Sequence, residues 1–327
     1  MYIAIDGGGT KTEYLLLDSN YEVMDRYLGG CLNHDFLEKG WADVRDILEN
    51  SVNILLERNN LVMSDIKYIA AGISGVDTAE DQKHVEECFS SAGISRFIAV
   101  NDGYLPIAAE NPAAWGVSLN CGTGMCCAAV DPFGNRMKLA GMDEWSGDAG
   151  GGNWIVVHMY RKVYESLILK DIRTPLVSAY MKAMNIETKV DFINSWSELK
   201  DRESAACREM HRKIIQIFFE LFENSNPEAQ TLAERMIRCA VYTVEAVVRE
   251  LHFDCEKIPV YLSGSILTRV ASEGYLSMLK EALSYICQGK LEVHMCIKRP
   301  VDGAVRMLSL KSLKTVKQAE QNGKETE

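Results

Sequence analysis

The chain contains one short unit twice, and this repeat constrains its fold more than any other feature. Each copy consists of an apolar strand, a glycine-rich turn and a second apolar strand. The first copy has strands at residues 2–5 and 14–17 around the turn DGGGTKT at residues 6–12. The second copy has strands at residues 115–119 and 125–130 around CGTG at residues 121–124. Such a repeat predicts two domains of related architecture, each beginning with the same unit.

Strand and helix patterns alternate through much of the chain, which is typical of an α/β protein. Further strands are expected at residues 22–28, 66–71, 96–100, 259–262 and 291–296. Helical spacing is expected over residues 37–59, 78–92, most of 154–251, 272–285 and about 301–313. The predicted domains are residues 1–114, joined by the last helix, and residues 115–300. The polar segment 314–327 is predicted to be a frayed tail.

Length and charge narrow the class of protein. A chain of 327 residues is long enough for two cores. Its net charge is −11, which argues against nucleic acid or an anionic membrane as the main partner. The N-terminal residues do not resemble a signal peptide, and no run approaches the roughly 20 apolar residues of a membrane helix. We therefore expect a cytoplasmic protein.

The ten cysteines are expected to be reduced and mostly buried, because the chain is large and has no signal-peptide pattern. Cys121, Cys126 and Cys127 cluster around the second glycine turn. We interpret them as small apolar residues that fill space around that turn. A redox site is the alternative.

The first glycine turn has the composition of a phosphate-binding loop. Its glycines permit positive φ and the close approach of an anion, and successive N–H groups can form an anion nest. Thr10 adds a hydroxyl donor, and Asp6 can hold Mg²⁺ through water. The turn matches neither the Walker A pattern nor the GxGxxG fingerprint. The alternative is a plain hairpin turn, although three glycines and a threonine exceed what a hairpin needs.

Asp102 follows a buried-type strand and lies between Asn101 and Gly103. A carboxylate there can accept the proton of an alcohol that attacks a γ-phosphate. Capping of the helix that begins at Tyr104 is the alternative role. Both interpretations are open at this stage.

Three other glycine-containing turns are candidate binding elements. Gly122-Thr123-Gly124 is a second candidate phosphate turn. In the loop at residues 146–154, Asp148 can bind a sugar hydroxyl or help to place a metal, and a lid without chemistry is the alternative. The glycine in the turn at residues 263–265 can admit a flat purine ring.

Taken in order, these motifs resemble the BadF/BadG/BcrA/BcrD-type ATPase family, and within it the N-acetylglucosamine kinases. The resemblance extends to about Leu310. It implies two duplicated ribonuclease-H-like (actin-like ATPase) domains with an interdomain cleft. It also implies ATP and Mg²⁺ as cofactors, a small-molecule sugar as substrate, phosphorylation of an amino sugar hydroxyl, and a homodimer.

The resemblance also assigns site residues. Asp102 corresponds to the general base on the sugar 6-hydroxyl. At ATP and its metal it places Asp6, Gly8, Gly9, Thr10, Lys11, Gly122, Thr123, Gly124, Gly264 and Ser265. At the sugar it places Asn33, His34, Ser74, Gly75, Asp102, Gly141 and Asp148.

Several positions depart from the family pattern. Asp35 stands where the kinases tend to have tryptophan, Ala149 replaces a glutamate, and Met142-Asp143 replaces a Trp-Gly pair, which bears on the identity of the sugar. Met125 replaces a serine and Phe222 replaces a small residue, which bears on nucleotide affinity. A non-catalytic sugar- or nucleotide-binding protein is the second hypothesis. An iron–sulfur ATPase activator of a dehydratase ranks below it, because the spacing of Cys121 differs from that branch.

Overall fold

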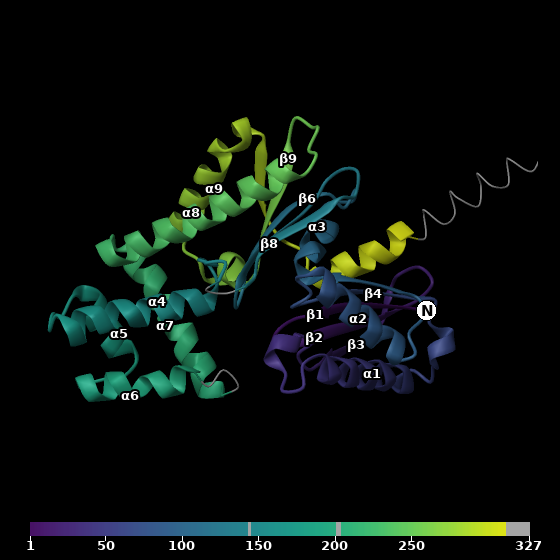
Figure 1. Cartoon of the computed structure of the whole chain (residues 1–327), viewed down its shortest axis with the longest axis horizontal. Coiled ribbons are helices and arrows are strands. Elements are labelled where there is room, and N and C mark those ends of the chain that lie inside the picture. Colours follow the sequence, from purple (N-terminus) through teal and green to yellow (C-terminus); the bar gives the residue numbers. More distant parts are fainter. Residues whose placement is uncertain (143–144, 201–203, 312–327) are drawn as a thin grey trace, which may run out of the picture. The chain divides into compact units, whose positions relative to one another are not determined.

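A computed structural model of the chain describes residues 1–142, 145–200 and 204–311 (Figure 1). The chain divides into two compact units. The first unit contains Met1–Ser118, Ala128–Lys138 and, at the C-terminal end of the described chain, residues 296–311. The second unit contains Leu119–Cys127 and Leu139–Met295. The predicted tail at residues 314–327 lies outside the described residues.

The sheet of the first unit has the strand order β3-β2-β1-β4-β5. Its strands are β1 (Tyr2–Gly7), β2 (Thr12–Leu17), β3 (Val23–Gly29), β4 (Tyr68–Ile73) and β5 (Phe97–Asn101). β1 is antiparallel to β2 and parallel to β4, which is parallel to β5. Asp6 pairs with Gly72, and Ile73 pairs with Asn101. The loops that follow β1, β4 and β5 therefore leave the sheet at one edge, where open α/β sheets bind ligands.

Helices cover both faces of this sheet because successive strand residues point to opposite sides. On one face, Ile3 and Ile5 pack in a core with apolar residues of α1 (Trp41–Arg58) and α2 (Ala79–Ser91). On the other face, Ala4 packs with apolar side chains of the helical segment 300–311. Shorter helical segments are η1 (His34–Phe36), η2 (Met63–Asp65), η3 (Asp102–Tyr104) and α3 (Leu105–Glu110).

The second sheet has the order β10-β9-β6-β7-β8. Its strands are β6 (Gly116–Cys121), β7 (Met125–Val130), β8 (Arg136–Ala140), β9 (Ile258–Ser263) and β10 (Leu291–Met295). Starting from β8, this is the order of the first sheet: third, second, first, fourth and fifth strand. The duplicated α/β architecture predicted from the two glycine turns is confirmed. β8, however, is not among the predicted strands.

The remaining elements of the second unit are mostly helical, as the sequence predicts. They are α4 (Gly152–Val163), η4 (Tyr164–Leu169), α5 (Pro175–Ala183), α6 (Lys189–Lys200), α7 (Ala205–Glu223), α8 (Pro227–Glu250), η5 (Ile266–Val270), α9 (Glu273–Tyr285) and η6 (Cys287–Gly289). The longest, α8, begins at a proline, and the Asn226 side chain caps it by accepting two backbone N–H groups. No helix in the described parts of the chain has the length and apolar character that crossing a membrane requires.

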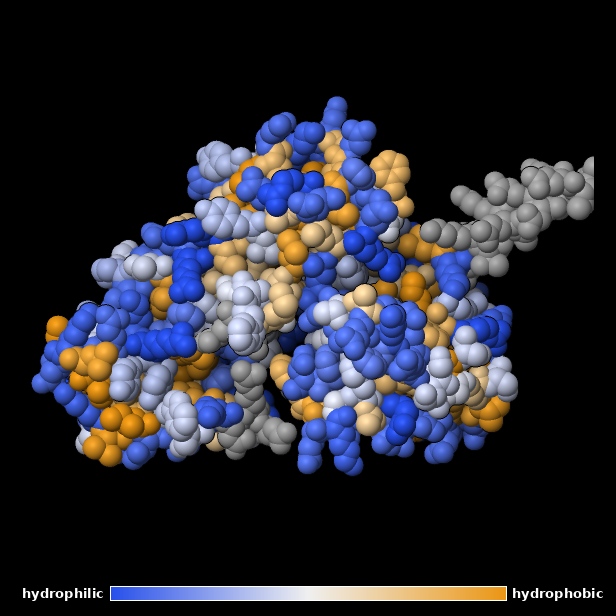
Figure 2. Space-filling view, viewed as in Figure 1, coloured by the Kyte–Doolittle hydropathy of each residue, from blue (hydrophilic) through white to orange (hydrophobic). Residues whose placement is uncertain are grey.

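One helix of the second unit exposes apolar side chains. In α6, Phe192 is buried, whereas Val190, Ile193 and Trp196 are exposed. Figure 2 shows hydrophobic residues on the surface of this part of the unit, near α5 and α6. A helix with apolar residues on its outer face is a candidate contact surface for another molecule.

Candidate functional site

Two predicted site carboxylates lie at the edge of the first sheet. Asp6 is the last residue but one of β1, and Asp102 begins η3 directly after β5. Burial, and then the charge of Asp102, raise the pKa of Asp6 to about 7. Burial also raises the pKa of Asp102 to about 6, although the Lys138 ammonium opposes this shift. Because the charge of Asp102 raises the pKa of Asp6, a cation bound there would stabilise the ionised form of Asp6.

These carboxylates suit a hard divalent cation. Mg²⁺ prefers carboxylate oxygens, water and phosphate oxygens, and it commonly takes only one or two protein carboxylates. Asp6 lies near a second carboxylate, Asp102, and a divalent cation there would offset the repulsion between the two negative charges. Within residues 1–142, 145–200 and 204–311, no three His, Cys, Asp or Glu side chains are grouped closely enough to hold a metal by themselves.

The first glycine turn is shaped by close packing. A Cβ atom at residue 7 would lie 2.9 Å from the Ile73 side chain, and one at residue 9 would lie 2.7 Å from the Phe36 ring. None of the glycines in this turn has a positive φ. The positive φ that glycine permits is therefore not used in this turn, and neighbouring side chains approach residues 7 and 9 closely. Thr10 and Lys11 are exposed at the open side of the turn.

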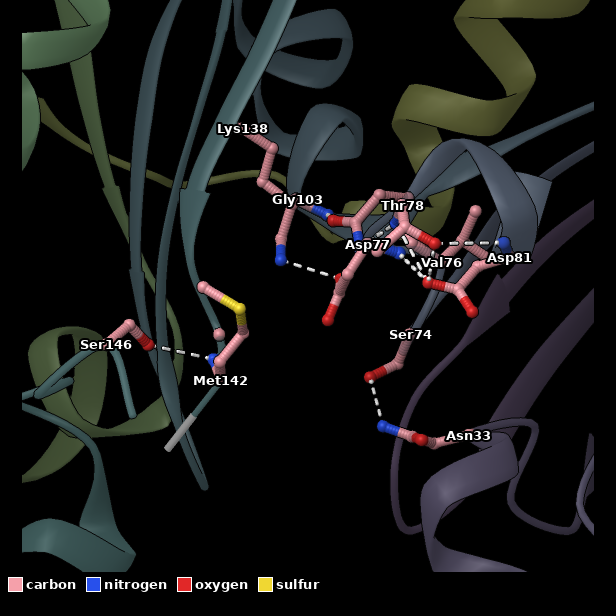
Figure 3. Close-up of polar contacts among 12 residues, drawn as sticks. Asn33, Ser74, Val76, Asp77, Thr78, Asp81, Gly103, Lys138, Met142 and Ser146 are labelled. Carbon is pink, nitrogen blue, oxygen red and sulfur yellow. Dashed lines mark hydrogen bonds and ion pairs between the residues drawn. The ribbon is translucent and has the colours of Figure 1, made fainter. Parts of the chain in front are cut away.

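The predicted sugar residues of the first unit come together. Asn33 Nδ2 donates to Ser74 Oγ over 3.1 Å, as Figure 3 shows. Gly75 has φ +81°, and a Cβ atom there would lie 2.7 Å from Asn33 Oδ1 and 3.1 Å from His34 Nδ1. His34 Nδ1 is buried and has no hydrogen-bond partner in the described parts of the chain. A ligand that binds beside Gly75 could supply that partner.

Sequence reasoning missed the residues that fix the His34 ring. The ring stacks on Trp41 with centroids 4.2 Å apart. Its Nε2 lies 3.3 Å from Asp35 and 3.8 Å from Asp81. Asp81 also completes the capping box of α2 with Thr78. The sequence Thr-x-x-Asp at the start of α2 is a capping signal, but it did not indicate a neighbour for His34.

The alternative role for Asp102, helix capping, is filled by its neighbour. Asn101 is the N-cap of η3, and its Oδ1 accepts the N–H of Gly103 over 2.8 Å. The following helix, α3, has no side-chain cap. Asn101, and not Asp102, is therefore the N-cap residue of this turn.

A second group that the sequence did not reveal lies around Asn101. Its Nδ2 donates to Asp77 Oδ1 over 3.0 Å, and Lys138 Nζ donates to the same oxygen over 2.6 Å. Figure 3 shows the Lys138 ammonium pointing at Asp77. These three residues line a pocket of about 230 Å³. The alternation of polar and apolar residues over 136–139 is the one sequence signal for the strand that carries Lys138.

In the second unit, two predicted nucleotide turns are in contact. Gly264 has φ +86°, and a Cβ atom there would lie 2.3 Å from the carbonyl oxygen of Cys121. The carbonyl of Gly122 accepts the N–H of Gly152 over 2.8 Å, so that the turn also rests on the start of α4. A Cβ atom at Gly151 would lie 2.5 Å from the Gly124 backbone. The turn at residues 122–124 is therefore fixed by backbone contacts from both sides.

The loop that carries Asp148 is closed by that residue's own carboxylate. Asp148 is buried, its Oδ2 accepts the N–H of Gly141 over 2.8 Å, and its Oδ1 accepts Ser146 Oγ over 2.6 Å. Ser146 Oγ in turn accepts the N–H of Met142, as Figure 3 shows. The structure thus brings the two predicted sugar residues Gly141 and Asp148 together. Asp143, one of the departures from the family pattern, lies outside the described residues.

The other residues that depart from the family pattern differ in their exposure to solvent. Met125, Ala149 and Phe222 are all buried, and the Phe222 ring packs edge-on against Tyr275. Asp35 is exposed beside His34. Among the described residues, which include all ten cysteines, no disulfide is formed.

Comparison with known proteins places this chain in a family. The model of the BadF/BadG/BcrA/BcrD ATPase family matches residues 3–305. The chain belongs to this family. The resemblance seen in the ordered motifs is thereby confirmed.

Two curated relatives cover most of the chain. The N-acetylmuramic acid/N-acetylglucosamine kinase of Clostridium acetobutylicum is 21% identical over 269 residues, which are 82% of this chain and 86% of the relative. The N-acetyl-D-glucosamine kinase of Dictyostelium discoideum is 24% identical over 293 residues, which are 85% of this chain and 88% of the relative.

Solved structures share the fold. A candidate N-acetylglucosamine kinase from Chromobacterium violaceum has a TM-score of 0.63 at 20% identity and covers 93% of this chain and 97% of its own. A ROK hexokinase from Thermus thermophilus has a TM-score of 0.52 at 17% identity, and the match covers 95% of this chain and 99% of the hexokinase. The actin-like sugar-kinase fold predicted from the sequence is confirmed.

Proposed function

We propose that this protein is an ATP-dependent kinase that phosphorylates a hydroxyl group of an amino sugar, with Asp102 as the general base. The observation that carries the proposal is the placement of Asp102. It lies at the same sheet edge as Asp6, the first glycine turn and the loop of Ser74 and Gly75. A proton acceptor, a candidate metal carboxylate and candidate sugar contacts therefore belong to one unit.

The protonation of Asp102 suits this role. With a pKa of about 6, raised by burial, the carboxylate is ionised at neutral pH and can accept a proton from the attacking hydroxyl. A base with a pKa near the working pH is more effective than an ordinary aspartate, because it holds the transferred proton better. The N-cap of the turn is Asn101, so capping is not the assigned role of Asp102.

The phosphates of ATP have candidate contacts in each unit. In the first unit, Thr10 and Lys11 are the exposed side chains of the glycine turn, and Asp6 would hold Mg²⁺ through water. Mg²⁺, when bound, neutralises phosphate charge and orients the transferred group. In the second unit, the turn at residues 122–124 offers backbone N–H groups, and Gly264 with Ser265 would contact the nucleoside.

The sugar is proposed to bind at Asn33, His34, Ser74 and Gly75. The buried Nδ1 of His34 lacks a partner in the described parts of the chain, and a sugar hydroxyl or acetamido group can satisfy it. Gly141 and Asp148 are further candidate contacts. N-acetylglucosamine or a close relative is the proposed acceptor, in agreement with the activities named for the two curated relatives.

We also propose a cytoplasmic homodimer. The exposed apolar residues of α6 support a contact between copies, because large apolar side chains are costly to leave in water. Light scattering of the purified protein, compared with an α6 variant such as Trp196→Glu, tests this point. If the wild type and the variant are both monomers, the proposed homodimer is contradicted.

The function is tested by ADP release with ATP and Mg²⁺ across a panel of sugars. The panel contains N-acetylglucosamine, glucosamine, N-acetylmuramic acid, N-acetylmannosamine, glucose and a sample without sugar. Release that depends on one amino sugar supports the kinase and identifies its acceptor. Release without sugar would indicate an ATPase, and no release together with sugar binding would indicate a non-catalytic binding protein.

A further inference from the structure

A set of side chains fixes the turn that carries Asp102. Asn101 Oδ1 accepts the N–H of Gly103 over 2.8 Å, on the C-terminal side of Asp102. Asn101 Nδ2 donates to the carbonyl of Val76 over 3.1 Å and to Asp77 Oδ1 over 3.0 Å. Lys138 Nζ donates to that same Asp77 oxygen over 2.6 Å. The loop after β4, the turn after β5 and strand β8 are thus joined through one carboxylate.

We propose that Lys138 and Asp77 are positioning residues for Asp102 in the phosphoryl transfer proposed above. Lys138 fixes Asp77, Asp77 fixes the Asn101 amide, and Asn101 fixes the turn on both sides of the base. The pair also determines the charge that faces the Asp102 carboxylate.

The burial of this pair distinguishes it from an ordinary surface ion pair. The Lys138 side chain is 8% exposed and that of Asp77 is 20% exposed. The free energy lost when two charges are removed from water often exceeds the free energy gained from their attraction. A buried ion pair is therefore weak evidence for a role in stability alone. The ion pair of Lys189 and Asp171 has the same length of 2.6 Å, but its side chains are 45% and 82% exposed. It provides a matched control without a nearby site residue.

The charges around Asp102 have opposite effects. Lys138, on β8, lowers the pKa of Asp102, whereas Asp77, in the loop after β4, raises it. Asp6, on β1, lies close enough for the two carboxylates to interact, and Lys11 in the glycine turn partly offsets the charge there. Removing Lys138 leaves Asp77 as an unneutralised charge beside the base. Removing the charge of Asp77 removes an influence that raises the pKa of Asp102, while the Lys138 ammonium still lowers it.

The test is a double-mutant cycle with Lys138→Met, Asp77→Asn and the double variant, read as the pH profile of kcat for the sugar that the wild type uses. Lys138→Met should move the acid limb to higher pH and, at pH values well below the midpoint of that limb, reduce kcat by about tenfold for each pH unit of that movement. Asp77→Asn should move the limb to lower pH. The double variant should return near the wild-type limb, and Lys138→Arg should retain most of kcat.

The KM for the sugar should change by no more than about threefold in these variants, because neither residue is proposed to contact substrate. Lys189→Met and Asp171→Asn should leave the profile unchanged. If Lys138→Met does not fold, two other results test the proposal. These are the movement of the acid limb in Asp77→Asn and the kcat retained by Lys138→Arg.

Two single variants with reduced kcat but an unmoved acid limb would overturn the proposal and leave the kinase function intact. A wild type without sugar-dependent turnover would overturn the kinase function, and the role of Lys138 and Asp77 with it.

Discussion

The backbone N–H of Ser74 donates to the carbonyl oxygen of Gly7 over 2.7 Å, so the loop after β4 is fixed to the first glycine turn. The N–H of Leu32 donates to the carbonyl of Gly8 over 3.2 Å and fixes the segment before Asn33 in the same way. The candidate sugar residues and the candidate phosphate turn of the first unit therefore share one backbone framework.

Gly75→Ala should weaken sugar binding. The new Cβ atom would lie 2.7 Å from Asn33 Oδ1, so the Asn33 side chain must move away from Ser74. Loss of one hydrogen bond to the sugar corresponds to about a tenfold increase in KM for the sugar. The KM for ATP should change little. Steady-state kinetics with each substrate varied in turn measures both values.

Gly93→Ala is the matched control for that substitution. Gly93 has φ +76°, similar to the +81° of Gly75, but no atom lies within 4 Å of the added Cβ. It should cost about 1 kcal/mol of stability from backbone strain without changing either KM. Equal kinetic effects of the two substitutions would show that strain, and not displacement of Asn33, is responsible.

Gly264→Ala should weaken ATP binding in preference to sugar binding. A Cβ atom at this position would lie 2.3 Å from the Cys121 carbonyl oxygen, so the turn after β9 and the end of β6 must separate. We expect a loss of about 3 kcal/mol in the free energy of unfolding and about a tenfold increase in KM for ATP. Gly134→Ala, where φ is +91° and the surroundings are open, is the control. An unchanged KM for ATP in Gly264→Ala would show that the turn after β9 does not contribute to nucleotide binding.

The stability of the metal-free protein should fall as pH rises because of Asp6. Its pKa in the folded state is about 7, above the ordinary value of 3.8, so the folded state binds more protons than the unfolded state between these values. The stability linked to this group is present below about pH 4 and is lost as pH rises toward 7. Thermal unfolding at several pH values in chelator should show this trend.

Asp6→Asn should flatten that trend, because the substituted residue does not titrate. At pH 7.5 without metal, the variant should be more stable than the wild type. Mg²⁺ with ATP should raise the unfolding temperature of the wild type more than that of the variant, since the ion would offset the repulsion between Asp6 and Asp102. An identical Mg²⁺-ATP effect in both proteins would contradict a metal role for Asp6.

Strand patterns in the sequence locate several candidate residues near strand ends, and the structure shows that these strands are parallel neighbours. Asp6, Ser74 and Asp102 each come at or just after the end of a buried-type strand. Parallel neighbours bring such ends to one edge, whatever the details of the loops. The repeat of two glycine turns predicted two domains of related architecture, and the two sheets have the same strand order.

Contacts between side chains were beyond the reach of sequence patterns. β8 is a short edge strand of five residues, and its alternation is brief, so Lys138 had no predicted place. The link from Lys138 through Asp77 to Asn101 joins residues 61 and 24 positions apart and has no local signature. The glycines of the first turn permit positive φ, but none of them adopts it. Packing against Ile73 and Phe36, which no local pattern reports, is what excludes a side chain there.

The central claim is that Asp102 is the general base, and the most direct test is turnover by Asp102→Asn with the sugar that the wild type phosphorylates. Asparagine keeps the size of the side chain but cannot accept the proton, so kcat should fall by about 100-fold or more. Sugar binding, measured by calorimetry, and the KM for ATP should remain near the wild-type values. A variant that retains wild-type kcat would contradict the account, because the hydroxyl proton would then be accepted elsewhere.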